Sequence, residues 1–435
     1  MPERNLNFDE IINRRGTDCL KYDFAVRRGM PEDVLPLWVA DMDFKTTSYV
    51  EDAVIERTKH GIFGYSESGE EYFKAVAGWM RRHHNWEIRP EWLIKTPGVV
   101  FALAMAVKAF TAKGDSVLIQ QPVYYPFSEV IQDNGRVVIS NDLYLGEDNR
   151  YHIDLADFEK KIVKYHVKLF LLCSPHNPTG RVFTKEELTA MGDLCVNHGV
   201  KVVSDEIHND FVFQGEHTVF ASVKKEYEEI SVICTSPSKT FNLASMLISN
   251  IFIPNRELRQ RFRHEVDAAG ISQLSVLGLV AAKAAYAQGD EWYEQMMSYV
   301  GENIRYVKEY VKEKYLLGTG MVTVLWAVAV AIAIGVNAFG YRMVSWEELI
   351  ASAAAGLFLA VFANAVVFPV QLKYGSSTGR LVLLVLVFGI MAVGWIGVEL
   401  CQKMKVDFSG LKNLGLRIWN LGIPVCLAML FVLML

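Results

Sequence analysis

A lysine flanked by hydroxyl side chains follows a short apolar run near the middle of the chain. The run, Val232-Ile233-Cys234, indicates a buried strand, and the segment Thr235–Asn242 after it contains Lys239. Burial disfavours the ammonium form, so it lowers the pKa of a lysine and frees its amine as a nucleophile. Such an amine can form a Schiff base with an aldehyde cofactor, and Ser236 and Ser238 are placed to bond a phosphate. An aldehyde and a phosphate together indicate pyridoxal 5'-phosphate, although a solvated turn lysine explains this octapeptide equally well.

Two other stretches offer groups suited to an anion and to a flat ring. Val99 and Val100 follow a Pro-Gly turn and open an apolar helix pattern, so their backbone N–H groups would face an anion, although a simple helix cap explains the same turn. Tyr124 lies between two prolines past a predicted strand at 116–120, where its ring can stack on a flat ligand or pack into the core. Tyr65 lies in a loop rich in Gly and Ser and is a further candidate ligand site.

Polar residues follow two more apolar strands. Asn177 lies in a Pro- and Gly-containing loop after the predicted strand 169–173, and Asp205 and His208 follow the predicted strand 200–203. Strands that alternate with helices predict a parallel, doubly wound α/β sheet, in which ligands bind at the carboxyl ends of the strands. One edge of that sheet would therefore collect Asn177, Asp205 and Lys239.

That convergence supplies a chemistry. Asp205 would keep a pyridine nitrogen protonated, Asn177 and His208 would hold the phenolic oxygen of the ring, and Tyr124 would stack on its face. Lys239 would bind the aldehyde and then act as the base that moves the substrate's α-proton. Asp210, a close neighbour, receives no role.

Residues from about 5 to 315 resemble the fold-type I pyridoxal-phosphate enzymes of the aminotransferase class I/II superfamily. Within it they are most similar to the cystathionine β-lyase, or C–S lyase, branch. Histidine at position 208, where many aminotransferases have tyrosine, favours the lyase branch. The motifs that carry the resemblance are Trp38-Val39-Ala40-Asp41-Met42-Asp43, Thr96-Pro97-Gly98-Val99-Val100, Pro122-Val123-Tyr124-Tyr125-Pro126-Phe127, Ser174-Pro175-His176-Asn177-Pro178-Thr179-Gly180, Asp205-Glu206-Ile207-His208 and Ser238-Lys239-Thr240-Phe241-Asn242.

The resemblance implies the β-elimination of a thiol from a sulfur amino acid, which leaves pyruvate and ammonia. It also implies a role in amino-acid metabolism and a homodimer in which Tyr65 reaches the neighbour's phosphate. In the family, a long helix, expected here at 290–315, leads into a small C-terminal domain that supplies the arginine for the substrate carboxylate. Nothing after Tyr315 resembles that domain, so no such arginine is assigned and we expect weakened catalysis. An aminotransferase on the same scaffold is the alternative enzyme.

Composition excludes several other classes of protein. The net charge of −5 gives no indication of a nucleic-acid partner, and the six scattered cysteines form no C-x-x-C pair and predict no metal site or disulfide framework. The first 15 residues are polar and charged, so we expect no secretory signal. Charged residues are frequent as far as Lys314 and are absent from Tyr315 to Tyr341, which divides the chain into two different parts.

The second part, 316–435, predicts four transmembrane helices. Its apolar stretches at about 320–341, 349–372, 381–398 and 418–435 contain no charge, and each is long enough to cross a bilayer core of about 30 Å. The segment Phe368–Gly375 before Arg380 resembles the loop of type-2 permease subunits of ATP-binding-cassette exporters. We therefore expect a multi-pass membrane protein, with the enzyme domain in the cytoplasm where its cofactor is made.

Both resemblances are incomplete where they meet, near Lys314-Tyr315-Leu316. The lyase-like part lacks its small domain, and such permeases usually have six spans, of which four would be present. A joined reading frame explains this more simply than an evolved membrane-tethered lyase. A third interpretation, from another class, is a membrane transport component whose N-terminal domain is not catalytic.

Overall fold

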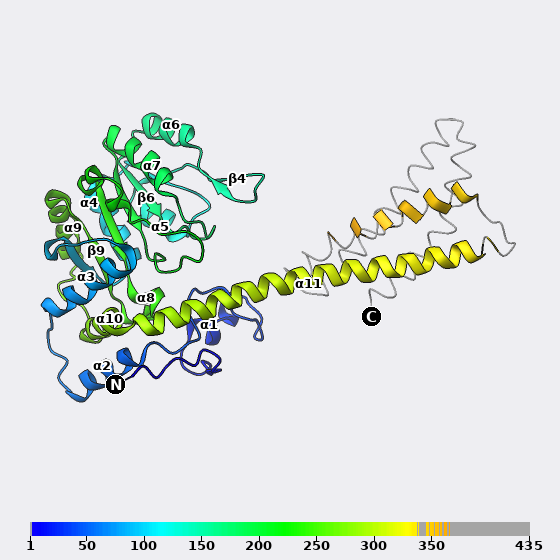
Figure 1. The fold of residues 1–435 in the computed structure, drawn as a ribbon. Helices are drawn as coiled ribbons and strands as arrows, with labels where there is room; N and C mark the ends of the chain where they lie inside the picture. The colour runs from blue at the N-terminus through cyan, green and yellow to red at the C-terminus, as the bar shows by residue number, and fades with distance from the viewer. Residues whose placement is uncertain are drawn as a thin grey trace. The chain divides into compact units, whose positions relative to one another are not determined.

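The computed structural model describes residues 2–336 and, beyond them, scattered positions between 338 and 365. Two compact units make up the chain, Met1–Gly301 and Glu302–Leu435. In the first unit, helices and strands alternate along the chain, as the sequence pattern predicts (Figure 1). The predicted spans at 381–398 and 418–435, and most of the span at 349–372, lie outside the described residues.

The strands are short and the helices are mostly of ordinary length. The strands are β1 Leu93–Thr96, β2 Ser116–Ile119, β3 Val137–Ser140, β4 Tyr144–Leu145, β5 Tyr151–His152, β6 Leu169–Cys173, β7 Lys201–Asp205, β8 Ser231–Thr235 and β9 Ser249–Phe252. The α-helices are α1 Leu20–Asp23, α2 Ser48–Lys59, α3 Glu70–His84, α4 Val99–Phe110, α5 Pro126–Gln132, α6 Leu155–Tyr165, α7 Lys185–Asn197, α8 Pro237–Thr240, α9 Arg256–Ala268, α10 Val276–Gln288 and α11 Asp290–Val336. Short 3-10 turns occupy Val26–Arg28, Pro90–Trp92, Phe220–Ser222, Lys225–Glu229 and Ala244–Met246.

Seven strands form one sheet in the order β1-β9-β8-β7-β6-β2-β3. Strand β9 runs antiparallel to both of its neighbours, β1 and β8, and the other pairs are parallel. The predicted α/β sheet is therefore confirmed, and it is mostly parallel, with β9 as the antiparallel exception. Because β1, β2, β6, β7 and β8 share one direction, their carboxyl ends lie along the same edge.

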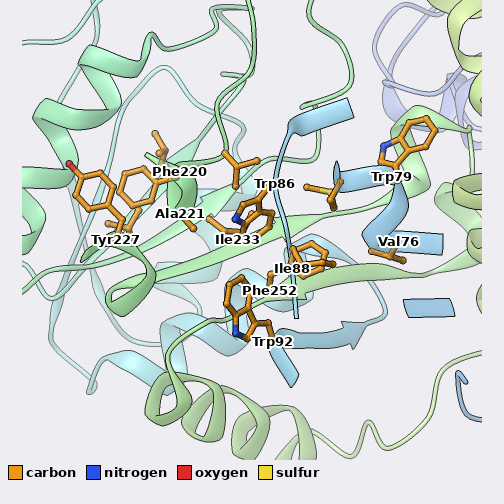
Figure 2. Packing of buried hydrophobic residues seen from close by; sticks show 14 of the residues in the cluster. Val76, Trp79, Trp86, Ile88, Trp92, Phe220, Ala221, Tyr227, Ile233 and Phe252 are labelled. Atoms are coloured by element: carbon orange, nitrogen blue, oxygen red, sulfur yellow. The ribbon is translucent and has the colours of Figure 1, made fainter. Parts of the chain in front are cut away.

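The hydrophobic core lies on both faces of this sheet, because successive strand residues point to opposite sides. On one face Phe170, Val202, Ile233 and Phe252 pack with residues of α3, α7 and α10. Figure 2 shows part of this cluster, where Trp86 lies beside Phe252 with ring centroids 5.4 Å apart. On the other face a second cluster joins strand residues to α4, α5 and α9; its strand members include Val117, Ile119, Leu169, Leu171, Val203, Val232 and Ile251.

The long helix α11 differs in length from its prediction. It was expected to end at Tyr315 but continues without interruption to Val336, so it includes most of the first predicted apolar span. The segment after Tyr315 contains no proline that would break the helix. Val324, Val328 and Ile332, spaced four residues apart, are each more than half exposed. Among the described residues, Asp290–Gly335 is the one helix long and apolar enough to cross a membrane.

Candidate active site

Three neighbouring strands end level with one another and place Asp205 at the centre of the sheet edge. Asp205 is the last residue of β7, and the pairing register sets it beside Cys173 of β6 and Cys234 of β8. Both thiols belong to the core cluster on the α4 side of the sheet, as does Val203, two residues before Asp205. The Asp205 side chain therefore faces α4 and is surrounded largely by apolar groups.

This environment changes the proton affinity of the carboxyl. Asp205 is 5% exposed, and its Oδ1 accepts a hydrogen bond from the backbone N–H of Ile207 at 3.1 Å. Burial raises the pKa of Asp205 to about 7, helped by the neighbouring Glu206, whereas the Ile207 hydrogen bond and the charge of Lys239 oppose the rise. In the part of the chain that the structure describes, no cation is hydrogen-bonded to it. The carboxylate is therefore poised to accept a cationic partner.

Lys239 lies on the short helix α8, after β8, within electrostatic range of Asp205. Its amine donates a hydrogen bond of 2.7 Å to the backbone carbonyl of Ala40. Burial lowers the pKa of Lys239, although the carboxylates of Asp41 and Asp205 oppose that change. The predicted shift of this lysine toward its nucleophilic form is therefore supported by its surroundings.

The segment that carries Ala40 is held by Asn242, three residues after Lys239. The Asn242 side chain accepts from the Met42 N–H at 3.1 Å and donates to the carbonyls of Met42 and Phe44 at 3.0 and 3.1 Å. Its φ of 57° lies in the left-handed region, which Asn tolerates better than most residues. The N-terminal segment is thus fixed directly against the lysine. The sequence predicts no role for Ala40 or Asn242, although both lie in the motifs quoted above, because nothing in the sequence pairs them.

Hydroxyl and amide groups gather at two chain turns beside this edge. Ser236 caps α8: its Oγ accepts from the Ser238 N–H at 3.1 Å and donates to the Ile248 carbonyl at 2.8 Å. Val99 and Val100 are the first two residues of α4, where backbone N–H groups have no partner inside the helix. A Cβ placed on Gly98, the residue before them, would meet no atom within 4 Å. The start of α4 is therefore open to a ligand.

The remaining predicted residues of the sheet edge have free polar groups. Tyr124 is 38% exposed, and burial raises the pKa of its phenol, with added repulsion from Tyr125 and Asp205. The Tyr124 N–H donates to the Asn177 carbonyl at 3.0 Å, which ties the two loops together. Burial and, to a smaller extent, the charge of Lys239 lower the pKa of His208 to about 4, so His208 is neutral at physiological pH. Within the described residues, no hydrogen bond is made by the side chain of Asn177 or His208.

Tyr65 was predicted to belong to the site but is exposed, whereas Asp210 was given no role but is buried. Tyr65 is 98% exposed in the loop between α2 and α3, and no contact of the described chain joins it to Lys239. Asp210 received no role from the sequence, yet it is 5% exposed and accepts hydrogen bonds from Trp79, His84 and Thr240. The sequence around Asp210 contains no indication of this burial, because its partners come from distant segments.

Two family matches divide the chain. Residues 32–325 match the family described as aminotransferase class I and II. Residues 307–435 match a family described as ABC-2 family transporter protein. The matches overlap within α11, close to the predicted junction of the two parts.

Curated and solved proteins resemble the first part. Cystathionine β-lyase PatB of Bacillus subtilis (strain 168) is 44% identical over 300 residues, which cover 69% of this chain and 77% of that protein. Cystalysin from Treponema denticola, whose crystal structure contains pyridoxal 5'-phosphate, aligns with a TM-score of 0.67 and 37% identity over 70% of this chain and 77% of its own. A pyridoxal-phosphate-bound C–S lyase from Staphylococcus hominis aligns with a TM-score of 0.66 and 33% identity over the same shares, 70% and 77%.

Proposed function

Because this chain belongs to the aminotransferase class I and II family, we propose that residues 1–315 form a pyridoxal-phosphate-dependent carbon–sulfur lyase, which catalyses β-elimination from sulfur amino acids such as cystathionine. The observation that carries the proposal is the buried Asp205 carboxylate, which lies at the strand ends within electrostatic range of Lys239. The chain is similar to lyases in both sequence and structure, which favours β-elimination over transamination as its reaction.

The site residues fit the cofactor at each of its ends. A buried carboxylate without a cation, a desolvated amine and the open start of α4 match a pyridine nitrogen, an aldehyde and a phosphate, respectively. When bound there, pyridoxal phosphate supplies an electron-withdrawing ring that stabilises negative charge at the substrate's α-carbon.

Each residue then has a defined task. Asp205 would hold a proton at the ring nitrogen, because a positive partner would offset the burial that raises the pKa of its carboxyl. Neutral His208 and the amide of Asn177 would bind the phenolic oxygen, and Tyr124 would cover one face of the ring. The hydroxyl of Ser238 and the N–H groups of Val99 and Val100 would bind the phosphate. The Ser236 hydroxyl would join them by turning its proton from the Ile248 carbonyl, 2.8 Å away, to the phosphate.

Lys239 carries the proton transfers. Its amine is the group that would hold the cofactor's aldehyde, and as the free amine it would remove the substrate's α-proton. The Ala40 carbonyl, 2.7 Å away, holds the amine in place while it is free. The departing thiol completes the elimination, and hydrolysis of the remaining fragment yields pyruvate and ammonia.

The assembly and location of the protein extend this proposal. We expect a homodimer in which the exposed Tyr65 reaches the phosphate site of the other subunit. Residues 316–435 form a membrane domain with four spans, and the enzyme domain lies in the cytoplasm. The ABC-2 transporter match at 307–435 and the apolar helix α11 support the membrane domain. Loss of the family's small domain is expected to weaken turnover more than cofactor capture.

Borohydride trapping on the full chain in detergent tests the enzyme assignment. We expect reduction in the presence of pyridoxal phosphate to leave a covalent adduct on the peptide that contains Lys239, and cystathionine to yield pyruvate. Lys239→Ala should abolish both, whereas Lys185→Ala, which removes an exposed lysine at the start of α7, should abolish neither. An adduct that persists on another lysine would overturn the assignment of Lys239. Conversion of an added keto acid without pyruvate release would instead favour an aminotransferase.

A further inference from the structure

Asp210 forms a buried hydrogen-bonded cluster that the proposed cofactor chemistry does not use. Its Oδ1 accepts from the indole N–H of Trp79 at 3.2 Å and pairs with Nε2 of His84 at 2.8 Å. Its Oδ2 accepts from the hydroxyl of Thr240. Burial opposes ionisation, but these donors lower the pKa of Asp210, so the group is a carboxylate.

The Thr240 contact joins this cluster to the lysine. Thr240 directly follows Lys239 and is fully buried. Helix α8 has only four residues, and a helix this short is not stable by itself. Its orientation therefore depends on hydrogen bonds at its two ends. Ser236 anchors the first end through the Ile248 carbonyl, and Thr240 anchors the second end through Asp210.

Asp210 also belongs to the loop that carries Asp205 and His208, the two residues of this loop proposed to bind the pyridoxal ring. It follows Asp205 and His208 in the same turn, in which the Asn209 N–H bonds the Glu206 carbonyl at 3.0 Å and the Phe211 N–H bonds the His208 carbonyl at 2.9 Å. The phenolic hydroxyl of Tyr293, from the first turn of α11, bonds the Asp210 carbonyl at 2.6 Å. One buried carboxylate thus links the ring-facing loop to the lysine-bearing helix.

We propose that Asp210, acting through the Thr240 hydroxyl, is a positioning residue that sets the location of the Lys239 amine relative to Asp205. This proposal rests on the proposed function, because it concerns the lysine that captures the cofactor. Asp210 does not itself contact the reacting atoms. Removing its bond to Thr240 should therefore impair covalent capture at Lys239 while leaving phosphate and ring binding in place.

Thr240→Val tests the link with little change of shape, and Thr240→Ser restores the hydroxyl. In the full chain in detergent, we expect Thr240→Val to slow adduct formation at Lys239 by about 10-fold or more, the scale expected for a displacement of about 1 Å or less. Binding of pyridoxine 5'-phosphate, which lacks the aldehyde, should stay close to the wild-type level. Thr240→Ser should recover the wild-type capture rate. Thr189→Val removes an exposed helix hydroxyl bonded to the Lys185 carbonyl and serves as the matched control.

Hydrogen exchange of the cofactor-free chain gives a second readout. The amides of Phe241 and Leu243, which bond the carbonyls of Pro237 and Ser238, should exchange about 10-fold faster in Thr240→Val, while those of β7 keep their protection. Three results for Thr240→Val would each overturn the positioning role. They are unchanged hydrogen exchange of the Phe241 and Leu243 amides, an unchanged rate of adduct formation at Lys239, and a loss of pyridoxine 5'-phosphate binding that parallels the loss of adduct formation. Failure of the wild-type chain to form any adduct would instead refute the proposed function, and the exchange data would still decide whether Asp210 anchors α8.

Discussion

Replacing Asp205 by Asn should stabilise the cofactor-free protein while it damages the enzyme. The carboxyl is buried, and its pKa is raised from 3.8 to about 7. Each pKa unit corresponds to about 1.4 kcal/mol, so ionised Asp205 costs the cofactor-free native state about 4 kcal/mol at pH 8. Asn removes the charge with little change of volume, and the variant should gain most of that free energy.

The sign of the pH dependence follows from the direction of the shift. Between pH 3.8 and about 7 the native state binds more protons at Asp205 than the unfolded state does, so this group lowers stability progressively as the pH rises. The advantage of Asp205→Asn should therefore be about 4 kcal/mol at pH 8 and below about 1 kcal/mol at pH 4. Saturating pyridoxal phosphate should stabilise the wild type more than the variant, because the cofactor supplies the missing cation.

Urea titration of the full chain in detergent measures this effect, with unfolding of the first unit followed by hydrogen exchange of peptides from β6, β7 and β8. Asp133→Asn, which alters an exposed carboxyl after α5, is the matched control and should change stability little at any pH. A variant that is no more stable than the wild type at pH 8, or equally stabilised at both pH values, would refute the burial argument.

Two further predictions concern packing and the N-terminal segment. Gly192→Ala places a Cβ 2.3 Å from the Tyr227 ring and should destabilise the protein by about 1–3 kcal/mol in urea titrations, whereas Gly64→Ala, with no atom within 4 Å, should have little effect. Asn242→Ala removes three hydrogen bonds to the segment 38–44 and should make that segment cleavable in limited proteolysis; an uncut segment would show that other contacts hold it.

The sheet and the edge that carries Lys239 were predictable because each depends on a sequence pattern only a few residues long. Each of the runs 169–173 and 232–234 is apolar, and each is followed by a polar segment, so strand, edge and lysine could be predicted together. The capping box that Thr184 and Glu187 form at the start of α7 is equally local, because the two residues are three positions apart. These features depend on residues a few positions apart.

What the sequence did not reveal depends on distant partners. From the sequence alone, Asp210→Ala would serve as the control for Asp205→Ala, because Asp205 has a predicted role and its neighbour Asp210 has none. Asp210 is not neutral, because Trp79 and His84 on α3 and Thr240 on α8 converge on it in the folded chain. No periodicity or motif near Asp210 indicates these contacts, because they form only when α3 and α8 meet at this residue in the folded chain.

The antiparallel strand β9 has a consequence for the order in which the active site assembles. Strand β1, which leads into the start of α4 that is proposed to bind the phosphate, joins the described sheet through β9, and Leu93 pairs with Phe252 far along the chain. Strands β8 and β9 are near neighbours in sequence, so their pairing closes a short loop, whereas the β1–β9 pairing must close a long one. During synthesis, α4 leaves the ribosome early, yet β1, which directly precedes it, takes its place in the sheet only after β9 has emerged. We therefore expect a nascent chain to hold a nearly formed lysine loop before it can hold a phosphate.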